Sequence, residues 1–469
     1  MPKKTFKNKD NPWKKKAISR TKTIKKQNKR IQELMASRDG WKNKCKYIEQ
    51  NASLSLIDDE KAVRHQYPIQ MVLLMVVWQA YGQMSLRSVR HCFAQLQIVL
   101  ALHCRVPSHS SIRNWLCKSG YYRIQQEQKS VRNPAEQWAL VIDESITIGS
   151  EKILLVLGLE LSTWQFTKSL SVEDVRVLAV ETSKGWSSEM ISQRLKDVGR
   201  THNIRYVISD GGINLKCALR LSSLVHVPDC SHVAANALAR QYTKHEGYIS
   251  LSKSAGALRR KWYLSKNVVY MPPVQRSKSR FQNIFPTIEW ALTIVQEWER
   301  IPIEVRAELM FVKKNEALVV EMFEQITVVN SLLKILKVKG FTAQAKEQIT
   351  VLIDTLKTPR GQCIRQEIAT YLTTLSSLTA SDETLVCCSD IIESYFGKFK
   401  QKINPNSPHS MTEFVLTIAN FAGAFNKQEI KEALEKITCT DLSKWNKNDA
   451  SLAKKRKKIF NKNGMKKAA

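Results

Sequence analysis

Residues 138–144 read WALVIDE, and residues 205–212 read RYVISDGG. Both segments begin as runs of apolar, β-branched and aromatic residues, a composition typical of a buried strand. The first run stops at Asp143 and the second at Asp210, which follows 67 residues later (210 − 143). The sequence therefore predicts two buried strands, each with a carboxylate at its end.

The segments around these two runs predict the remainder of an α/β sheet. The expected elements are strands at 153–161 and 175–182, helices at 187–200 and 214–222, a strand at 224–228 and a helix from about Asp229. Three strands followed by helix, strand, helix, strand and helix is the element order of a ribonuclease-H-like core. We therefore expect a mixed five-stranded sheet with flanking helices, in which the ends of the first and fourth strands, and so Asp143 and Asp210, lie side by side.

Asp143 and Asp210 have two explanations. Asp and Gly often mark strand ends because they form turns, and that explanation suffices for either aspartate alone. Two carboxylates held side by side repel each other, and a divalent cation with oxygen ligands is the usual compensation, so the pair favours metal binding. Glu144 is the nearest alternative to Asp143, but as its neighbour in a strand it points to the opposite side of the sheet.

A third acidic residue follows a long helical segment. Residues 244–381 are dominated by helical periodicity, and this stretch is too long for a loop, so we expect an all-α insertion. The next segment, SDIIESYFGKFKQKI, predicts a helix with Ser389 as N-cap and an apolar stripe along one side. Glu393 and Lys400, seven residues apart, share a face of that helix, and Asp390 is the alternative acidic residue.

The charge of the chain indicates a polyanionic partner. The 469 residues contain 74 Lys and Arg against 42 Asp and Glu, a formal net charge of +32. Residues 1–50 contribute +13 (17 − 4) and residues 442–469 contribute +9 (10 − 1), so the two ends hold 22 of the 32 charges. Such an excess favours binding to nucleic acid. The basic C-terminal tail either grips phosphate without reading sequence or only aids solubility.

The sequence argues against a membrane-spanning or secreted protein. The longest apolar run, Ile69 to Ala80, is about half of the roughly 20 residues that a span requires, and no signal-peptide core follows the basic N-terminus. The ten cysteines form no CxxC pair, so a cytoplasmic, nucleoid-associated protein is expected. One group of residues has two explanations, burial on short helices or a zinc site. Its members are His91, Cys92, His103, Cys104 and His109.

Two N-terminal regions have the pattern of DNA-binding helices. Heptad spacing between Ile24 and Ile48 predicts a basic amphipathic helix that pairs with a second copy or lies along DNA. Three short helices are expected between residues 67 and 122, the last beginning after Ser108 or Ser110 and ending at Gly120. The last two suit a helix-turn-helix, or a trihelical bundle without DNA contacts. In the last helix the expected inward residues are Ile112, Trp115 and Leu116, and the expected outward, DNA-binding residues are Arg113, Asn114 and Lys118.

These features divide the chain into six parts. They are a basic helical or coiled-coil arm (1–60), a helix-turn-helix-like DNA-binding domain (61–133), the first part of the ribonuclease-H-like core (134–243), the α-helical insertion (244–381), the C-terminal helices of the core with the third acidic residue (382–440) and a basic tail (441–469). The predicted core is thus interrupted by the insertion.

The acidic motifs resemble those of the DDE transposases of bacterial insertion sequences, which have a ribonuclease-H-like core split by a helical insertion. The resemblance rests on Asp143 in VIDES, Asp210 in VISDGG and Glu393 in SDIIESYFGKFK, in that order. It implies phosphoryl transfer assisted by two Mg²⁺ or Mn²⁺ ions, with Asp143 bridging the ions and Asp210 and Glu393 each completing one shell. It also implies double-stranded DNA as partner, both the inverted-repeat ends and the target, and a homodimer in the DNA complex.

Accessory motifs extend this resemblance. Asp229 and His232 in VPDCSH are similar to the Cys/Asp-x-x-His motif that follows the second aspartate in several transposase superfamilies, including hAT and Mutator-like elements. His232 either orients a carboxylate or contacts the scissile region, or it bonds to Asp229 and fixes the start of the insertion. The pair Glu393 and Lys400 resembles the Glu-x6-Lys part of another cut-and-paste signature, whose Tyr and Arg are absent here. The lysines expected to contact DNA are Lys398, Lys400 and Lys402.

Two other functions remain open at this point. One is a transposase-derived DNA-binding protein without catalysis, which the presence of all three acidic residues argues against. The other is a ribonuclease-H-like nuclease or resolvase that cuts without joining. The insertion and the separate N-terminal region favour transposition.

Overall fold

A computed structural model describes residues 12–51, 60–99, 105–130, 133–148, 151–164, 167–275, 284–380, 383–403, 411–445 and 460. Its contacts divide the chain into two units, Met1–Glu60 and Lys61–Ala469, and each is described by itself. No helix in the described part of the chain is long and apolar enough to span a membrane. Most of the predicted basic tail lies outside the described residues.

Within its described residues, the first unit is a single helix, α1 (Pro12–Asn51), of 40 residues. The predicted N-terminal helix is therefore confirmed. Its apolar seam residues are exposed along the described part of the seam, at Ile24, Ile31, Leu34 and Trp41. Pairing with a second copy, or binding along DNA, stays a prediction for this helix.

The second unit contains the expected mixed five-stranded sheet. Its elements in chain order are β1 (Gln137–Ile148), β2 (Glu151–Glu160), β3 (Arg176–Ser183), α5 (Ser188–Gly199), β4 (Asn203–Ser209), α6 (Ile213–Leu221), β5 (His226–Pro228) and α7 (Cys230–Tyr242). The strand order is β3-β2-β1-β4-β5. Strands β1, β2 and β3 pair antiparallel, whereas β1–β4 and β4–β5 pair parallel. The predicted succession of strands and helices is confirmed.

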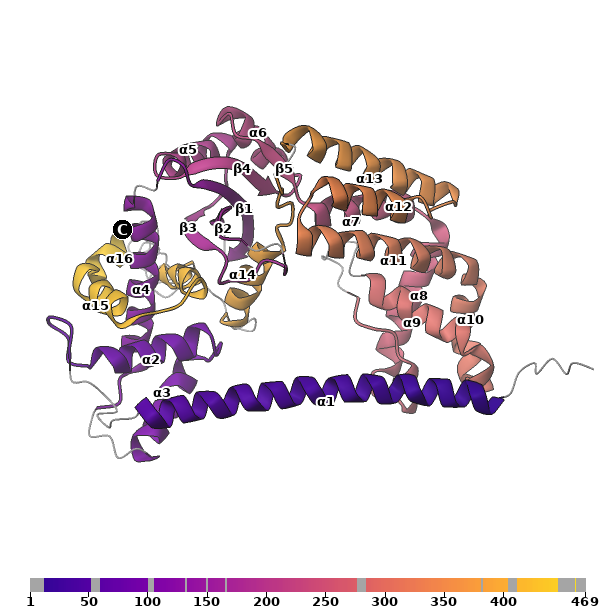
Figure 1. Ribbon diagram of the computed structural model, residues 1–469, viewed down its shortest axis with the longest axis horizontal. Coiled ribbons are helices and arrows are strands. Elements are labelled where there is room, and N and C mark those ends of the chain that lie inside the picture. The colour runs from indigo at the N-terminus through magenta and orange to yellow at the C-terminus, as the bar shows by residue number, and fades with distance from the viewer. Residues whose placement is uncertain are drawn as a thin grey trace, which may run out of the picture. The chain divides into compact units, whose positions relative to one another are not determined.

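Alternation along β1 assigns its residues to the two faces of the sheet. Leu140 and Ile142 belong to the apolar cluster that α5 and α6 complete. Ala139 and Val141 belong to the cluster on the other face, which also contains residues of α7 and of α14 (Asp390–Gln401). Figure 1 shows α5 and α6 on one side of the sheet and α14 on the other. Because side chains alternate, Asp143 follows Val141 onto the face of α7 and α14.

The prediction that the first strand stops at Asp143 is wrong. Strand β1 continues for five residues to Ile148, because its antiparallel pairing with β2 continues to the pair Ile148 and Glu151. What stops near Asp143 is the apolar run and the pairing with β4, whose last pair is Val141 and Ile208. An apolar run records burial, and a strand outlasts it wherever one neighbour remains paired.

The insertion is helical, as predicted. Its helices are α8 (Glu246–Trp262), α9 (Phe285–Gln296), α10 (Ile303–Lys314), α11 (Glu316–Lys339), α12 (Ala343–Ile353) and α13 (Pro359–Leu378), with short 3-10 turns η1 (Lys266–Tyr270) and η3 (Trp298–Arg300). Helices α11 and α13 pack on α7, and their apolar residues join the cluster on the α7 face of the sheet. The insertion therefore shares one hydrophobic core with the sheet (Figure 1).

Among the described residues of the second unit, three helices precede the sheet. They are α2 (Ile69–Ala80), α3 (Leu86–Val99) and α4 (His109–Lys129). Ser108 caps α4 by accepting a hydrogen bond from the Ser111 N–H at 3.0 Å, which confirms the predicted start. The predicted end at Gly120 is wrong, because α4 runs nine residues further to Lys129. A Cβ at Gly120 would lie 2.1 Å from the carbonyl oxygen of Leu416, so this glycine permits close packing rather than ending the helix.

The chain after α14 returns to α4. The segment forms η4 (Glu413–Phe421), α15 (Lys427–Lys436) and α16 (Cys439–Trp445), all of which contact α4. Ile430 and Leu434 complete the apolar cluster of α2, α3 and α4. The N-terminal helices and the C-terminal segment thus form one packed region, although about 300 residues separate them in sequence.

Candidate active site

Asp143 lies in β1, and Asp210 directly follows the adjacent strand β4. The last parallel pair of β1 and β4 joins Val141 to Ile208. Asp143 lies two residues after Val141, and Asp210 lies two residues after Ile208. Both carboxylates are half-buried. Asp210 Oδ1 accepts a hydrogen bond from the Gly212 N–H at 3.0 Å, which fixes this side chain at the start of α6. The sequence-based expectation that the two aspartates lie side by side agrees with this register.

Glu393 reaches the same edge from a distant part of the chain. It lies in the first turn of α14, and α14 packs against β1. The helix buries its apolar stripe, as expected, and leaves Glu393 exposed. The negative charge of Glu393 is the smallest of the causes that raise the pKa of Asp143.

The pKa of Asp143 records this concentration of negative charge. Burial, then the charge of Asp210 and, as the smallest cause, the charge of Glu393 together raise the pKa of Asp143 to about 7, although His232 and the backbone of Glu144 oppose the shift. Carboxylates repel one another most strongly where water is partly excluded. A cation bound among these three side chains would remove that repulsion.

The two alternative acidic residues have other partners. Glu144 lies on the opposite face of β1 and forms an ion pair with Lys152 at 3.4 Å. Asp390 forms an ion pair with Lys337 of α11 at 2.5 Å. Neither residue is among those that raise the pKa of Asp143.

The donor chemistry of the three carboxylates fits magnesium or manganese. All of their donor atoms are oxygen, the ligand that these hard cations prefer. The three residues do not converge on one point, because within the described residues only Asp229, Cys230 and Cys388 form a close-set group of possible ligand atoms. An open set of carboxylates at a half-exposed edge is compatible with ions that also bind water or substrate oxygen.

Asp229 and His232 lie beside these carboxylates. Asp229 is the N-cap of α7 and accepts the His232 N–H at 2.8 Å. Its Oδ2 also lies 3.0 Å from His232 Nδ1, and because a carboxylate only accepts, Nδ1 is the donor. The charge of His232 acts on Asp143. Both readings of His232 are therefore compatible with the geometry: it bonds to Asp229 and it lies near a carboxylate of the site.

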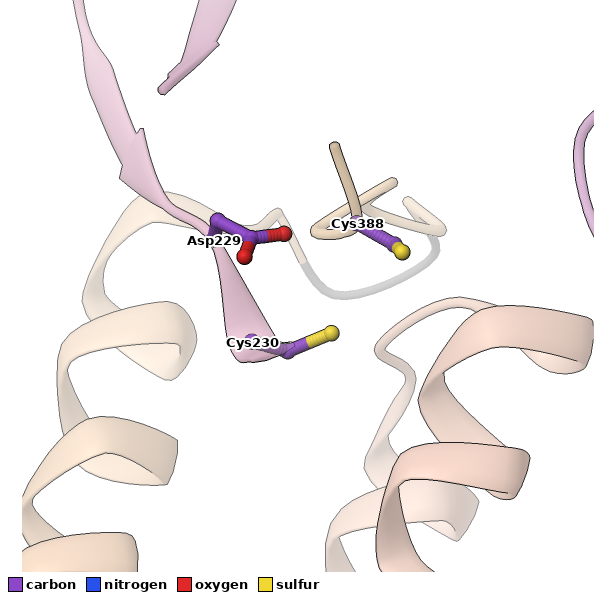
Figure 2. Close-up of side chains that lie close together, drawn as sticks. All are labelled: Asp229, Cys230 and Cys388. Atoms are coloured by element: carbon purple, nitrogen blue, oxygen red, sulfur yellow. The ribbon is translucent and has the colours of Figure 1, made fainter. Parts of the chain in front are cut away.

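Asp229 also belongs to a buried group with two thiols. Figure 2 shows Asp229, Cys230 and Cys388 close together, with ligand atoms within 4.8 Å of one another. The pKa values of both thiols are raised, by interactions between the cysteine side chains and by burial. Mixed oxygen and sulfur donors suit zinc rather than magnesium. This group therefore has no bearing on whether the carboxylate edge binds Mg²⁺.

The other zinc site considered from sequence is only partly within view. His103 and Cys104 lie outside the described residues. The remaining members do not form a close-set group of ligand atoms in the described part of the chain, where Cys92 is exposed.

The three lysines at the C-terminal end of α14, where Lys402 is the C-cap, differ in their surroundings. Lys400 is exposed. Lys402 donates to the carbonyl oxygen of Gln79 at 3.2 Å and lies 4.2 Å from the ring centre of Phe421, and burial followed by the charge of Lys398 lowers its pKa to about 7. Burial also lowers the pKa of Lys398. Lys400 is therefore the one of the three that is placed to meet an external phosphate.

In α4 the predicted inward residues are buried, but the predicted outward orientation is wrong for Lys118. The inward residues Ile112, Trp115 and Leu116 lie in the core. Lys118 is only 8% exposed and donates to the carbonyl oxygen of Leu434 at 3.0 Å. Arg113 forms an ion pair with Glu413 at 2.6 Å, and Asn114 is half-buried. The reason is that the C-terminal segment covers this side of α4; DNA contacts by these three residues stay predictions.

Sequence reasoning missed the residues that hold the start of α14. The Tyr206 hydroxyl accepts the Val386 N–H at 2.9 Å, and Lys337 pairs with Asp390. No local signal could have identified Tyr206 or Lys337, because each is an ordinary residue of a strand or helix whose partner is remote in sequence.

No family model matches this chain, and a search of curated proteins also found no match. The functional assignment therefore depends on the residues and their arrangement alone.

Proposed function

We propose that this protein is a DDE-type DNA transposase with a ribonuclease-H-like catalytic core. The observation that supports this proposal is that Asp143, Asp210 and Glu393, which come from β1, the end of β4 and α14, lie along one edge of the sheet, where the charges of Asp210 and Glu393 help to raise the pKa of Asp143. The strand order 3-2-1-4-5 with an antiparallel first half and a parallel second half is compatible with such a core. The helical insertion before Glu393 is compatible with this class as well.

The acidic residues would hold two Mg²⁺ or Mn²⁺ ions, with Asp143 between them and Asp210 and Glu393 at the two sides. When bound, the ions would activate a water or a 3′-hydroxyl and stabilise the leaving oxygen. His232, held by Asp229, carries a proton at Nδ1 and presents the rest of its ring near Asp143. Lys400, exposed two turns beyond Glu393 on α14, would contact a DNA phosphate close to the ions.

The proposed reaction has two steps. Hydrolysis at an element end breaks a phosphodiester bond and releases a 3′-hydroxyl, and this hydroxyl then attacks a phosphodiester of target DNA and displaces another 3′-oxygen. The net charge of +32 suits a protein that must bind both DNA segments, and the chemistry at two ends favours a homodimer in the DNA complex. A nucleoid-associated location follows from these partners.

The test uses purified full-length protein, Mg²⁺ and labelled DNA that carries the inverted repeats flanking the reading frame. Wild-type protein should cleave the end and join it to target DNA, and Asp210→Asn should do neither while still binding the DNA. Asp441→Asn is the matched control, because the Asp441 carboxylate lies in α16 and accepts hydrogen bonds from the Thr438 N–H and hydroxyl at 2.9 and 2.7 Å. Binding without cleavage by wild type would instead indicate a DNA-binding protein, and cleavage without joining would indicate a nuclease or resolvase.

A further inference from the structure

The insertion separates Glu393 in sequence from the two aspartates of the carboxylate site, so contacts within the fold must bring Glu393 back to them. Asp143 and Asp210 belong to the sheet, whereas Glu393 follows more than 130 residues of inserted helices. Three hydrogen bonds from or to its backbone join the segment that leads back from the insertion into α14 to β4 and the start of α7. They are Val386 N–H to the Tyr206 hydroxyl (2.9 Å), Cys230 N–H to the Cys387 carbonyl (2.8 Å) and Ser389 N–H to Asp229 Oδ1 (2.6 Å).

Asp229 makes the last of these bonds and is shared between the two parts of the core. Oδ1 accepts the Ser389 N–H, and Oδ2 accepts both the backbone N–H and the Nδ1–H of His232. The two partners are 157 residues apart (389 − 232). One carboxylate therefore connects the start of α7 with the start of α14. Figure 2 shows the Asp229 side chain near that of Cys388, which precedes Ser389.

The carboxylate is buried, which makes these bonds strong and their loss costly. Asp229 is only 1% exposed. Burial alone would raise the pKa of Asp229, but the hydrogen bonds from the His232 side chain and the Ser389 amide lower it below its usual value. A buried carboxylate with three N–H donors is a fixed point of the structure, because removing its charge leaves donors without an acceptor.

Asp229 also takes over a capping function at α14. Ser389 precedes the helix, and its own side chain makes no capping hydrogen bond. Asp229 instead accepts the Ser389 amide at the N-terminal end of α14, where a negative charge is favourable. Glu393 lies four residues after Ser389, about one helical turn away, so the position of this amide determines where Glu393 points.

We propose that Asp229 is a positioning residue of the carboxylate site, which aligns Glu393 with Asp143 by holding Ser389 and orients His232 with its other oxygen. The expected effect on metal binding rests on the proposed function. The hydrogen bond between Asp229 and Ser389 does not depend on that function. Asp229 touches neither ion nor DNA in this proposal. Its effect on the site passes through Glu393 and His232.

The first test is a double-mutant cycle read by Mn²⁺ affinity, measured by electron paramagnetic resonance of the free ion. Asp229→Asn should weaken Mn²⁺ binding about tenfold or more, the loss typical of residues that orient metal ligands. In a Glu393→Gln background the same substitution should have little effect, because the residue that Asp229 aligns is already lost. Equal losses in both backgrounds, or no loss in either, would overturn the proposal. Asp441→Asn should leave Mn²⁺ affinity unchanged.

The second test needs no metal and so separates the two proposals. In hydrogen exchange, Asp229→Asn should increase the exchange of amides in residues 385–401 at least about tenfold while β1 and β4 keep wild-type protection. Unchanged exchange in 385–401 refutes the positioning role whatever the activity. If wild-type protein shows no Mn²⁺ binding that depends on Asp210, the proposed function is refuted. The hydrogen-exchange result alone then decides whether Asp229 positions α14. If Asp229→Asn does not fold, Ser389→Pro removes the donated N–H and provides the same comparison.

Discussion

The sequence predicted functional residues both at the edge formed by β1 and β4 and along the helix α4. In the structure the sheet edge stays partly exposed, whereas the predicted DNA-binding side of α4 is covered. At the sheet edge, a segment remote in sequence brings Glu393 toward Asp143 and leaves the edge half-exposed. At α4, another remote segment covers the side that carries Arg113 and Lys118 and supplies partners for both. The acidic residues at the sheet edge thus form a candidate site, whereas the basic residues of α4 make contacts inside the protein.

The difference lies in how each charge is compensated. Arg113 meets the carboxylate of Glu413, and Lys118 meets a carbonyl oxygen, so both cations have acceptors within the protein. At the sheet edge, burial and then the charges of the neighbouring carboxylates Asp210 and Glu393 raise the pKa of Asp143. A cluster of like charges that the fold keeps together, despite this cost, indicates a ligand of opposite charge.

The largest effect is expected at the sheet edge. If the proposed function holds, Asp143→Asn should reduce Mg²⁺-dependent DNA cleavage by about 100-fold or more, because it would remove a ligand that the two ions share. The free energy of unfolding without metal should not fall, since the substitution removes one of several repelling charges. Cleavage of end-labelled DNA and urea denaturation measure the two quantities.

Glu144→Gln is the matched control for this prediction. Glu144 is the adjacent residue, is also acidic, and differs in facing the other side of the sheet and pairing with Lys152. Its substitution should change activity by no more than about twofold. An inactive Glu144→Gln protein, or an active Asp143→Asn protein, would show that the faces of β1 are misassigned.

A second prediction concerns the covered side of α4. Gly120→Ala should destabilise the protein by about 2–3 kcal/mol, because the new Cβ would overlap the Leu416 carbonyl oxygen and push the C-terminal segment from α4. Gly397→Ala in α14 should instead stabilise it by roughly 0.5–1 kcal/mol, since nothing lies within 4 Å of a Cβ there and alanine favours helix. Chemical denaturation measures the free energy of unfolding of both variants. If Gly120→Ala changed this free energy only slightly, the C-terminal segment would not pack on α4.

The sequence predicted elements well because their signals are local. Apolar alternation, a capping serine and the 3.6-residue period are contained within a dozen residues, so strands such as β2 and the start of α4 were placed correctly. Gly120 shows the limit of such signals. A glycine after a helical run usually marks its end, but here its lack of a side chain serves a contact with Leu416, nearly 300 residues later.

The candidate site was predictable only in part, for the same reason. The order of strands sufficed to bring Asp143 and Asp210 together, because parallel pairing fixes which strand ends meet. Tyr206 and Lys337 hold α14 through contacts across the insertion, and no spacing rule contains them. The spacing of Asp229 and His232 did identify Asp229, but not its hydrogen bond to Ser389. The orientation of Lys118 likewise depended on a partner at Leu434.

The smallest expected effect separates two lysines of α14 that sequence treated alike. Lys402 has a pKa of about 7 rather than its ordinary value near 10.5, because burial, followed by the charge of Lys398, disfavours its protonated form. Between these two pH values the unfolded chain binds a proton that the folded chain does not, so this residue makes stability rise with pH. Lys402→Met should therefore increase the free energy of unfolding by about 1 kcal/mol at pH 7 and have less effect near pH 10.

Lys400→Met provides the comparison, because Lys400 is exposed two residues earlier on the same helix. It should leave the free energy of unfolding unchanged at both pH values, and should weaken DNA binding with a salt dependence reduced by about one phosphate contact. Urea denaturation of both variants between pH 6 and 10 measures the difference. If Lys402→Met followed the wild-type pH dependence throughout this range, the amine of Lys402 would be solvated like that of Lys400, and both lysines would again be equal candidates for contact with DNA.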